Sequence, residues 1–414
     1  MSSLPTALAV LAAVACSASE APTPETTRGA TTSATTDDRT PAPPATVDAT
    51  ITAEQRRITI AFAGDVHFEG SLERRLDDPP SALAPIAPQL SAADLTVVNL
   101  ETSIGAGARP EPKRFTFQAP PTAFDALAAA GVDVVTMANN HAGDYGRDGI
   151  RQALDAAAAQ SANDSLSVIG IGNTADDAFA PASFDIDGTS VAVLGASAAD
   201  EDPTADATGH LAATDTEPGT ADAADPARLV RAVEQARADS DVVVVYLHWG
   251  VQGESCPSEA QTALAQAVAD AEADIVVGSH THRLQGAGLL DDTFVAYGLG
   301  NYVWYTQASA ATTTTGVLTL TVDGGTVVDQ HWAPAVIGSD GLPHPVSGAQ
   351  ADRMIEDFAG LTGCADLELL GRLALGHPGR RASRPRQRSG DRCDSTRLHI
   401  GITRRCPASG TTSS

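Results

Sequence analysis

Residues of the types that bind metal ions recur through the middle of the chain, each at the end of a short apolar run. One pair has the spacing Asp-x-His and another has the spacing His-x-His, with single Glu, Asn and His residues between them. The complete set is Asp65, His67, Glu101, Asn140, His248, His280 and His282. Carboxylates and neutral imidazoles are good ligands for divalent metals such as Mn, Fe and Zn. The pattern therefore predicts a metal centre.

The two spaced pairs are each suited to one cation. Side chains at positions i and i+2 of a strand point to the same face, so a single metal can bind both. Asp65 and His67 have this spacing at the end of one apolar run, and His280 and His282 have it after another. The spacing predicts that both members of each pair are ligands.

The single residues add bridging and proton transfer to this chemistry. The carboxylate of Glu101 can bridge two cations, and Asn140 offers a neutral oxygen. Two cations about 3.5–4 Å apart can clamp a phosphoryl group and generate hydroxide at neutral pH. His141 lies next to a predicted ligand without being needed as one, so it can protonate a leaving oxygen.

Each of these signals also has an ordinary structural interpretation. An isolated Asp or Asn after a strand is usually a turn former, and His248 beside Trp249 is consistent with a half-buried structural histidine. The combination favours chemistry, because turn formation alone would not select imidazole at several successive strand ends.

The elements that must position these residues are short β-branched runs that alternate with Ala-rich amphipathic stretches. The runs predict strands at 58–64, 95–100, 132–137, 167–171, 190–196, 241–247, 274–278 and 293–298. The stretches predict helices near 83–92, 121–130, 147–160, 226–238, 258–271 and 349–361. Such alternation implies an α/β fold with a largely parallel sheet, in which ligands bind at the carboxyl ends of the strands.

Two segments depart from this alternation. Residues 316–336 show two alternating strands around Asp323-Gly324-Gly325, which predicts a hairpin and therefore a mixed sheet. Residues 200–224 are acidic and show no apolar period, so we expect a surface insertion there. Pro226 and Ser258 are the expected starts of two helices.

The polar strand ends resemble the CapA-type poly-γ-glutamate capsule synthesis family, a branch of the calcineurin-like metallophosphoesterases. The matching segments are AGDVHFEG (63–70), VNLETSIG (98–105), ANNHAGDYG (138–146), LHWGVQ (247–252), GSHTHRLQG (278–286) and GLGNYVW (298–304). They occur in the order and spacing of the family within about residues 58–337. The resemblance implies a metallophosphatase-like four-layer αββα sandwich, in which two mixed β-sheets pack together with helices outside.

The resemblance also implies a role for each site residue at one of two divalent metal ions. Asp65 and His67 match the D-x-H motif and would ligate one metal. Glu101 would bridge, where the superfamily usually has an Asp that is shorter by one methylene. Asn140 and His141 match the N-H pair of ligand and proton donor.

The remaining ligands come from two later motifs of the same superfamily. His248 matches its single later histidine. His280 and His282 match its G-H-x-H motif, although Ser279 separates the glycine from the first histidine in this chain.

Two functions follow from the resemblance. The first is a metal-dependent hydrolase of the metallophosphoesterase type, which acts on a phosphoester or related bond during capsule or poly-γ-glutamate formation. The alternative is a non-catalytic, metal-containing subunit that binds or exports the nascent anionic polymer. Polyglutamate synthase membrane subunits are the expected protein partners. A purely structural lipoprotein would not need the metal-ligand set.

The charge of the chain limits its partners. Its 414 residues contain 52 acidic and 26 basic side chains, for a formal net charge of −26. Such a surface repels nucleic acid, and it also repels polyglutamate except at local cationic sites. Arg109, Lys113 and Arg114 are one candidate for such a site, but we favour the interpretation that this cluster is a solvated loop.

The N-terminal residues indicate export. Residues 1–16 contain an apolar run followed by Cys16, which predicts a signal peptide and lipidation of that cysteine, with an ordinary secretion signal as the alternative. Residues 17–57 are rich in Thr, Ala and Pro and predict a disordered tether. We expect the protein outside the cytoplasm, anchored to the outer face of the cell membrane through an N-terminal lipid, or secreted.

The rest of the chain divides into a body and a tail. Residues 58–365 are the predicted CapA-like domain, and residues 366–414 are a basic tail that we expect to be disordered. The five cysteines show no CxxC metal pattern. In an exported protein Cys256 and Cys364 could form a disulfide, although their spacing does not show that they lie close together.

Overall fold

The computed structural model describes residues 57–163, 165–199, 202 and 211–370. The predicted signal segment with Cys16, nearly all of the predicted tether and the tail after residue 370 lie outside these residues. Within the described residues, no helix is long and apolar enough to cross a membrane.

The larger of two main sheets runs in the order β18-β17-β16-β1-β2-β5-β6, and β15 also pairs with β1. Strands β1, β2, β5 and β6 are mutually parallel, whereas β16, β17 and β18 add antiparallel pairs. The strands are β1 (Arg57–Val66), β2 (Leu95–Leu100), β5 (Val134–Thr136), β6 (Ser167–Ile169), β15 (Asn301–Val303), β16 (Thr314–Asp323), β17 (Thr326–Ile337) and β18 (Pro343–Pro345).

The second sheet has the order β13-β14-β12-β11-β9-β8. Its inner strands are parallel, and each edge strand is antiparallel to its neighbour. The strands are β8 (Ala182–Ile186), β9 (Thr189–Ser197), β11 (Val242–His248), β12 (Ile275–Ser279), β13 (Ala287–Leu290) and β14 (Thr293–Ala296). Both sheets are therefore mixed.

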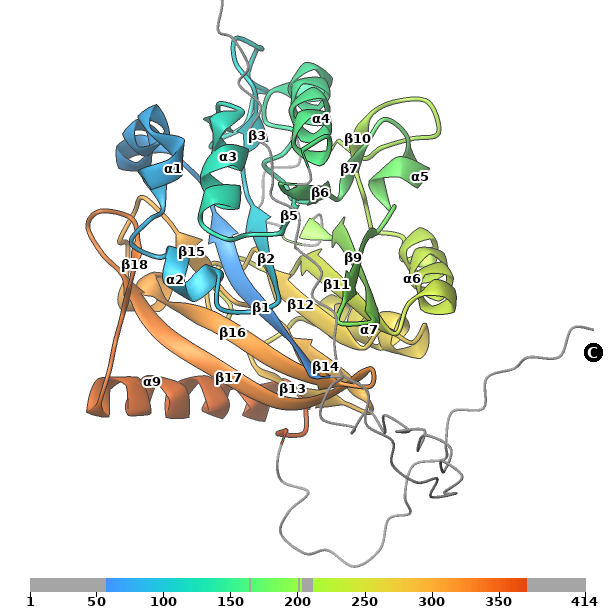
Figure 1. Ribbon diagram of the computed structural model, residues 1–414, viewed down its shortest axis with the longest axis vertical. Helices are drawn as coiled ribbons and strands as arrows, with labels where there is room; N and C mark the ends of the chain where they lie inside the picture. Colours follow the sequence, from blue (N-terminus) through green and yellow to red (C-terminus); the bar gives the residue numbers. More distant parts are fainter. Residues whose placement is uncertain (1–56, 164, 200–201, 203–210, 371–414) are drawn as a thin grey trace, which may run out of the picture. The chain divides into compact units, whose positions relative to one another are not determined.

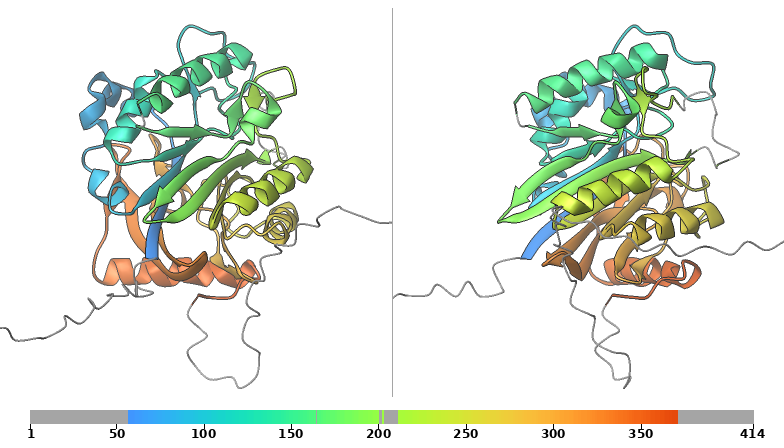
Figure 2. Two further views of the ribbon diagram at one scale, coloured as in Figure 1. Left: turned by 45° about the vertical axis from the view of Figure 1, so that its right-hand side comes forward. Right: turned by 90° about the vertical axis from the view of Figure 1, so that its right-hand side faces the viewer.

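The alternation of side chains along the strands stacks these sheets into layers. In β1, Ile58, Ile60 and Phe62 pack against the second sheet, whereas Ala61 and Ala63 face the opposite way. Helices α3 (Thr122–Ala129) and α4 (Gly146–Ser161) cover that opposite face, and α6 (Ala227–Asp239) and α7 (Glu259–Asp270) cover the outer face of the second sheet (Figures 1 and 2). The predicted four-layer αββα sandwich with two mixed sheets is confirmed.

Shorter elements surround these layers, and α9 (Ala349–Gly360) packs against β17 through Phe358 and Trp332. The short helices are η2 (Gly70–Asp77), α1 (Pro79–Ala82), α2 (Ala87–Leu90), α5 (Ala175–Ala178), α8 (Ala310–Thr313) and η4 (Leu361–Cys364). The short strands are β3 (Ser103–Ile104), β4 (Gln118–Ala119), β7 (Ile171–Gly172) and β10 (Gly219–Thr220).

Several local predictions are confirmed by the elements themselves. β16 and β17 form the expected hairpin, with Gly324 and Gly325 both at positive φ in its turn. Pro226 is the N-cap of α6, and Ser258 caps α7 in a reciprocal capping box with Gln261. A capping box satisfies backbone donors that the first turn of a helix leaves unpaired.

Three local predictions are wrong in part. The helix expected near 83–92 is reduced to the short helix α2, and α1 ends before it, because Pro85 disfavours helical backbone at the residue before it. The strand expected at 167–171 ends at Ile169, where Gly170 turns at φ +80°. β7 then pairs with β10, so part of the expected surface insertion joins a small sheet.

A disulfide joins Cys256, in the loop before α7, to Cys364 in η4. The sequence allowed this pairing, and the structure confirms it. The bridge links η4 to the loop before α7, one of the helices that cover the second sheet.

Candidate metal centre

The predicted ligands gather where strands of both sheets reach their carboxyl ends. Asp65 lies near the end of β1, and Glu101 follows β2 directly. In the second sheet, His248 is the last residue of β11, and His280 follows β12. The four side chains are fully buried. Because the two sheets pack face to face, ligands from strands far apart in the chain meet here.

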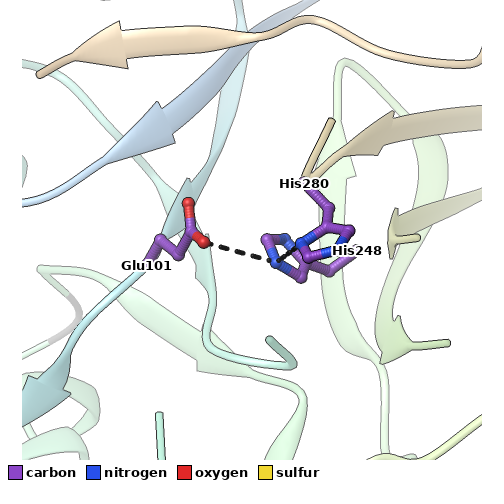
Figure 3. A group of neighbouring side chains, drawn as sticks. All are labelled: Glu101, His248 and His280. Carbon is purple, nitrogen blue, oxygen red and sulfur yellow. Dashed lines mark hydrogen bonds and ion pairs between the residues drawn. The ribbon is translucent and has the colours of Figure 1, made fainter. Parts of the chain in front are cut away.

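One group of ligand atoms surrounds the imidazole of His248 (Figure 3). Its Nε2 lies 2.7 Å from Asn140 Oδ1, 3.0 Å from His280 Nδ1 and 3.5 Å from Glu101 Oε1. Two imidazole nitrogens, an amide oxygen and a carboxylate oxygen thus converge on one point. This is a donor set that a divalent metal accepts.

A second group joins Asp65, Glu101 and His282. His282 Nδ1 lies 3.4 Å from Asp65 Oδ2 and 4.0 Å from Glu101 Oε2. Glu101 belongs to both groups, and it presents Oε1 to the first and Oε2 to the second. That geometry is the one a bridging carboxylate requires.

His67 lies beside this second group but is part of neither. Its ring stacks on Trp304 with centroids 3.9 Å apart, and its Nε2 accepts a hydrogen bond from Tyr305 N at 3.3 Å. Its Nδ1 is buried and has no hydrogen-bond partner among the described residues. The structure therefore places His67 at the centre without bringing it into contact with the other predicted ligands.

The polar atoms of this region fit a cation. Among the described residues, both carboxylate oxygens of the fully buried Glu101 lack a hydrogen-bond partner. A buried carboxylate without donors is costly, so it either takes up a proton or is offset by a positive charge. Divalent metal ions would supply that charge.

The two carboxylates have opposite pKa shifts. Burial raises the pKa of Glu101 well above its usual value, and the nearby charge of Asp65 raises it further. Burial acts in the same direction on Asp65, but contacts with His282, His248 and Asn99 outweigh it and lower the pKa of Asp65. Asp65 is thus an anion at neutral pH. Glu101 holds its proton more readily, and a bound cation would displace that proton.

The buried histidines are held in their neutral form. Burial is the largest cause that lowers the pKa of each of them, namely His67, His141, His248 and His280. Neutral imidazole is the form that binds metal. The charge of Lys113 lowers the pKa of His141 further.

His141 lies next to the first group, as the predicted proton donor should. Its Nε2 is 3.8 Å from Glu101 Oε1, and its Nδ1 is 2.7 Å from Asp144 Oδ2. Because a carboxylate only accepts, Nδ1 carries the hydrogen of that bond. Asp144 stood in the sequence motif without a predicted role, and it fixes the orientation of the His141 ring.

Buried amides connect the strand ends to one another. Asn99 Nδ2 donates to Asp65 Oδ1 at 2.8 Å, and Asn139 Nδ2 donates to Asn99 Oδ1 at 3.0 Å. Asn139 Oδ1 accepts from the backbone of His141 and of Ala142. The sequence placed these asparagines at strand ends, but only the structure shows that they hold the ligands in position.

One contact at the centre was not predicted from the sequence. Asp202, within the segment expected to be a surface insertion, is buried, and its Oδ2 lies 3.3 Å from His280 Nε2. The same oxygen accepts from Gln252 N at 2.8 Å. The surface prediction is therefore wrong at Asp202, and nothing in the sequence distinguishes this Asp from its acidic neighbours.

The backbone of the His-x-His pair is strained. His280 has φ +95° and His282 has φ +55°, a region that residues with a Cβ rarely adopt. The two side chains therefore do not point the same way as in a strand, and the structure places His280 in the first group and His282 in the second rather than at one shared cation. Strain of this kind persists where the surrounding structure imposes it, and it is concentrated at functional sites.

The cationic cluster on the loop between β3 and β4 divides into two kinds of residue. Arg109 and Arg114 are exposed, as expected for a solvated loop. The side chain of Lys113 is only 1% exposed and forms an ion pair with Asp144 at 2.6 Å. The solvated-loop prediction is therefore wrong for Lys113, because a buried carboxylate beside the centre draws the ammonium inward.

Two solved structures match this chain at low sequence identity. A hypothetical protein from Thermus thermophilus is 16% identical with a TM-score of 0.40, over 67% of this chain and 98% of that one. A novel phosphatase from Mycoplasma pneumoniae is 15% identical with a TM-score of 0.41, over 68% of this chain and 94% of that one.

Curated proteins are similar over the same region. The chain is 29% identical over 253 residues to the PGA biosynthesis protein CapA of Bacillus subtilis (strain 168), across 60% of this chain and 63% of that protein. It is 28% identical over 263 residues to the capsule biosynthesis protein CapA of Bacillus anthracis, across 61% of each. The chain thus spans about three fifths of the length of these relatives.

The family model described as the bacterial capsule synthesis protein PGA_cap matches residues 59–306. This span runs from β1 to just beyond β15, so it includes every predicted metal ligand and His141. The match confirms the family that the sequence motifs resemble. The chain belongs to the bacterial capsule synthesis protein PGA_cap family.

Proposed function

We propose that this chain is a metal-dependent hydrolase of the metallophosphoesterase type that acts in capsule or poly-γ-glutamate formation. The observation that carries the proposal is the position of Glu101. Its carboxylate is fully buried, has no hydrogen-bond partner among the described residues and presents one oxygen to each of two ligand groups. A side chain so placed is suited to bridge two divalent cations.

The chain supplies a set of ligands for each of two cations. Asp65 and His282 with Glu101 would hold one, and Asn140, His248 and His280 with Glu101 would hold the other. His67 lies in neither group, and its buried, unpartnered Nδ1 would add a further ligand to the first cation. Divalent ions bound there would polarise a phosphoryl group and lower the pKa of a water molecule. The metal identity is proposed as Mn, Fe or Zn from the mixed imidazole and carboxylate donors.

His141 would protonate the leaving oxygen. Its Nδ1 is occupied by Asp144, so only Nε2 faces the ligand groups. The Asp144 carboxylate and the negative charge of a bound phosphoester both favour a proton on Nε2 when substrate is present. Phe117 stacks on the ring at 4.2 Å and limits its rotation.

The pathway and location are proposed from the relatives and the cysteines. The curated relatives are named for PGA and capsule biosynthesis, which supports a role with polyglutamate synthase membrane subunits. The Cys256–Cys364 disulfide supports a location outside the cytoplasm, because such bonds persist in oxidising compartments. Anchoring through a lipid on Cys16 remains part of the same proposal.

The test compares the purified chain with a His280→Ala/His282→Ala variant. We expect wild type to bind divalent metal, measured by elemental analysis, and to hydrolyse an aryl phosphate monoester or diester with added Mn²⁺. The variant should lose both properties, whereas His331→Ala, which changes an exposed histidine on β17, should lose neither. Metal binding without turnover of either ester would favour the polymer-binding alternative. A wild type without metal would overturn the metal centre itself.

A further inference from the structure

Lys113 is the single lysine of the chain, and it lies on the segment between β3 and β4. Its Nζ donates to Asp144 Oδ1 at 2.6 Å and to the backbone oxygen of Asn140 at 2.7 Å. Removing an ammonium from water is expensive unless it is paired, so this burial depends on Asp144. The lysine thus contacts both the carboxylate that orients His141 and the backbone of a predicted ligand.

Asp144 collects donors on both of its oxygens. Oδ1 accepts from Lys113, and Oδ2 accepts from Phe117 N at 2.6 Å and from His141 Nδ1 at 2.7 Å. The side chain is fully buried. With the carboxylate fixed by Lys113 and by the backbone, the direction of the His141 ring is fixed as well.

The same segment holds His141 from a second side. Phe117, four residues after Lys113, stacks its ring on the imidazole with an interplanar angle of 17°. Lys113 acts through Asp144 on the edge of the imidazole, and Phe117 covers its face. Both contacts come from the segment that joins β3 to β4, a part of the chain that provides no predicted metal ligand.

We propose that Lys113 is a positioning residue for His141, which aims Nε2 at the leaving oxygen of the substrate. The role rests on the proposed function. As the bond from phosphorus to the leaving oxygen breaks, its electron pair goes to that oxygen, which takes the proton from His141 Nε2. Water supplies the oxygen of the new bond to phosphorus. The proton that it releases passes to solvent, from which His141 Nε2 is protonated again.

The first test uses the full chain and two esters that differ in their need for an acid. p-Nitrophenyl phosphate releases a stable anion, whereas phenyl phosphate needs protonation of its leaving oxygen. The variants are Lys113→Met, Asp144→Asn, the double variant and Lys113→Arg, which keeps the charge. Arg109→Met is the matched control, because it removes an exposed charge from the same segment.

Lys113→Met should lower kcat/KM for phenyl phosphate at least roughly tenfold more than for p-nitrophenyl phosphate, since general acid catalysis typically contributes a hundredfold or more. Asp144→Asn should act alike, and the double variant should be no worse than the single ones. Lys113→Arg should restore part of the loss, and Arg109→Met should change neither ester. If the wild type is active and Lys113→Met loses equally on both esters, the positioning role alone is overturned. A wild type inactive on both esters would overturn the proposed function, and this role with it.

The second test needs no turnover, and its decisive measurement is made on the folded wild type. The protein is acylated with acetic anhydride and its peptides are analysed by mass spectrometry. Because the chain has a single lysine, any acylated lysine is Lys113. Lys113 should react far more slowly than the N-terminal amine in the wild type, and faster in Asp144→Asn. Rapid acylation of Lys113 in the folded wild type would show that the ion pair does not hold the amine, and would overturn the proposal.

Discussion

Glu101 shows how one side chain can be costly for the fold and necessary for the site. Its carboxylate is buried without donors among the described residues, while Asp65 lies close enough to raise its pKa. A protein that only needed a stable core would not place a carboxylate there, because its desolvation is uncompensated. The cost is explained if a cation offsets it.

Replacing Glu101 by Gln should therefore separate stability from metal binding. We expect the metal-free variant to unfold at a temperature equal to or above that of the metal-free wild type. Its free energy of unfolding should be higher by up to about 1 kcal/mol. The increase in melting temperature on adding Mn²⁺ should disappear. Glu234→Gln, an exposed change on α6, should alter neither quantity. A variant that keeps the full metal response would contradict the bridging role.

The pH dependence of metal binding follows from the same pKa. A raised pKa means that Glu101 still holds its proton above its usual value of 4.5, so metal must displace that proton. Affinity should rise with pH from 4.5 until the carboxyl group of the metal-free protein is ionised. The buried histidines add no proton release above their usual value of 6.5, because their pKa values are lowered and they are already neutral.

Calorimetric titration of the metal in two buffers of different ionisation enthalpy measures this proton release. The apparent enthalpy should differ between the two buffers for wild type, because the released proton is taken up by the buffer. Glu101→Gln, which we expect to lose the metal, should give no binding heat in either buffer. Identical enthalpies for wild type would show that Glu101 is already ionised before metal binds.

At the scale of elements, the close approach of β1 to the segment before β15 sets the position of Asp65. Asp65 N donates to Gly300 O at 2.8 Å, and Gly64 has no room for a side chain at this point. A Cβ on Gly64 would lie 1.8 Å from Gly300 O. Glycine is therefore required where the strand delivers its ligand.

Gly64→Ala should separate these segments and displace Asp65. We expect a loss of stability of about 3 kcal/mol from overpacking and a lower metal content in the protein that still folds. Gly360→Ala is the control, because a Cβ there meets no atom within 4 Å, and its free energy of unfolding should change by less than about 1 kcal/mol. Denaturant unfolding and elemental analysis measure the two effects. Equal stability of both variants would contradict the steric explanation.

The segment after β9 also acts on the centre, through Asp202. Removing the carboxylate that contacts a metal-binding histidine typically weakens metal affinity about tenfold or more, because the ring loses its fixed orientation. We expect Asp202→Ala to show this loss in a competition titration with a chelator. Asp215→Ala, which removes an exposed acid paired with Arg228, should bind metal as the wild type does. Unchanged affinity in Asp202→Ala would mean that the contact does not orient His280.

At the scale of the whole molecule, the stacking of two mixed sheets decides where chemistry can occur. Each of the two ligand groups contains residues from both sheets, so neither sheet forms the centre alone. Asp65 and Glu101 come from the larger sheet, and the three later histidines come from the second. The core between the sheets thus holds the two halves of the site in register.

The Cys256–Cys364 disulfide should stabilise this whole arrangement without tuning the centre. It closes a loop with a sequence separation of 108, and bridges of this kind typically contribute about 2–4 kcal/mol. Reductant should lower the melting temperature of the wild type but leave the metal content of the folded protein unchanged. A Cys256→Ser/Cys364→Ser variant should melt at the lower temperature and show no response to reductant. A wild type insensitive to reductant would show that the bridge does not form or does not stabilise.

The sequence by itself determined the kinds of ligand, the strand ends that carry them and the family. These features are local, because a residue's type and the apolar run before it belong to one short stretch of chain. The Asp-x-His and His-x-His spacings did not decide which ligands share a group, since His280 and His282 lie in different groups and His67 lies in neither. Only the tertiary structure decided which strand ends meet, that Glu101 faces both ligand groups, and that Lys113 and Asp202 turn inward to Asp144 and His280. An acid or a lysine on a loop has the same local pattern whether it is solvated or paired. Its burial depends on a partner that long-range packing supplies, and no spacing along the chain encodes that partner.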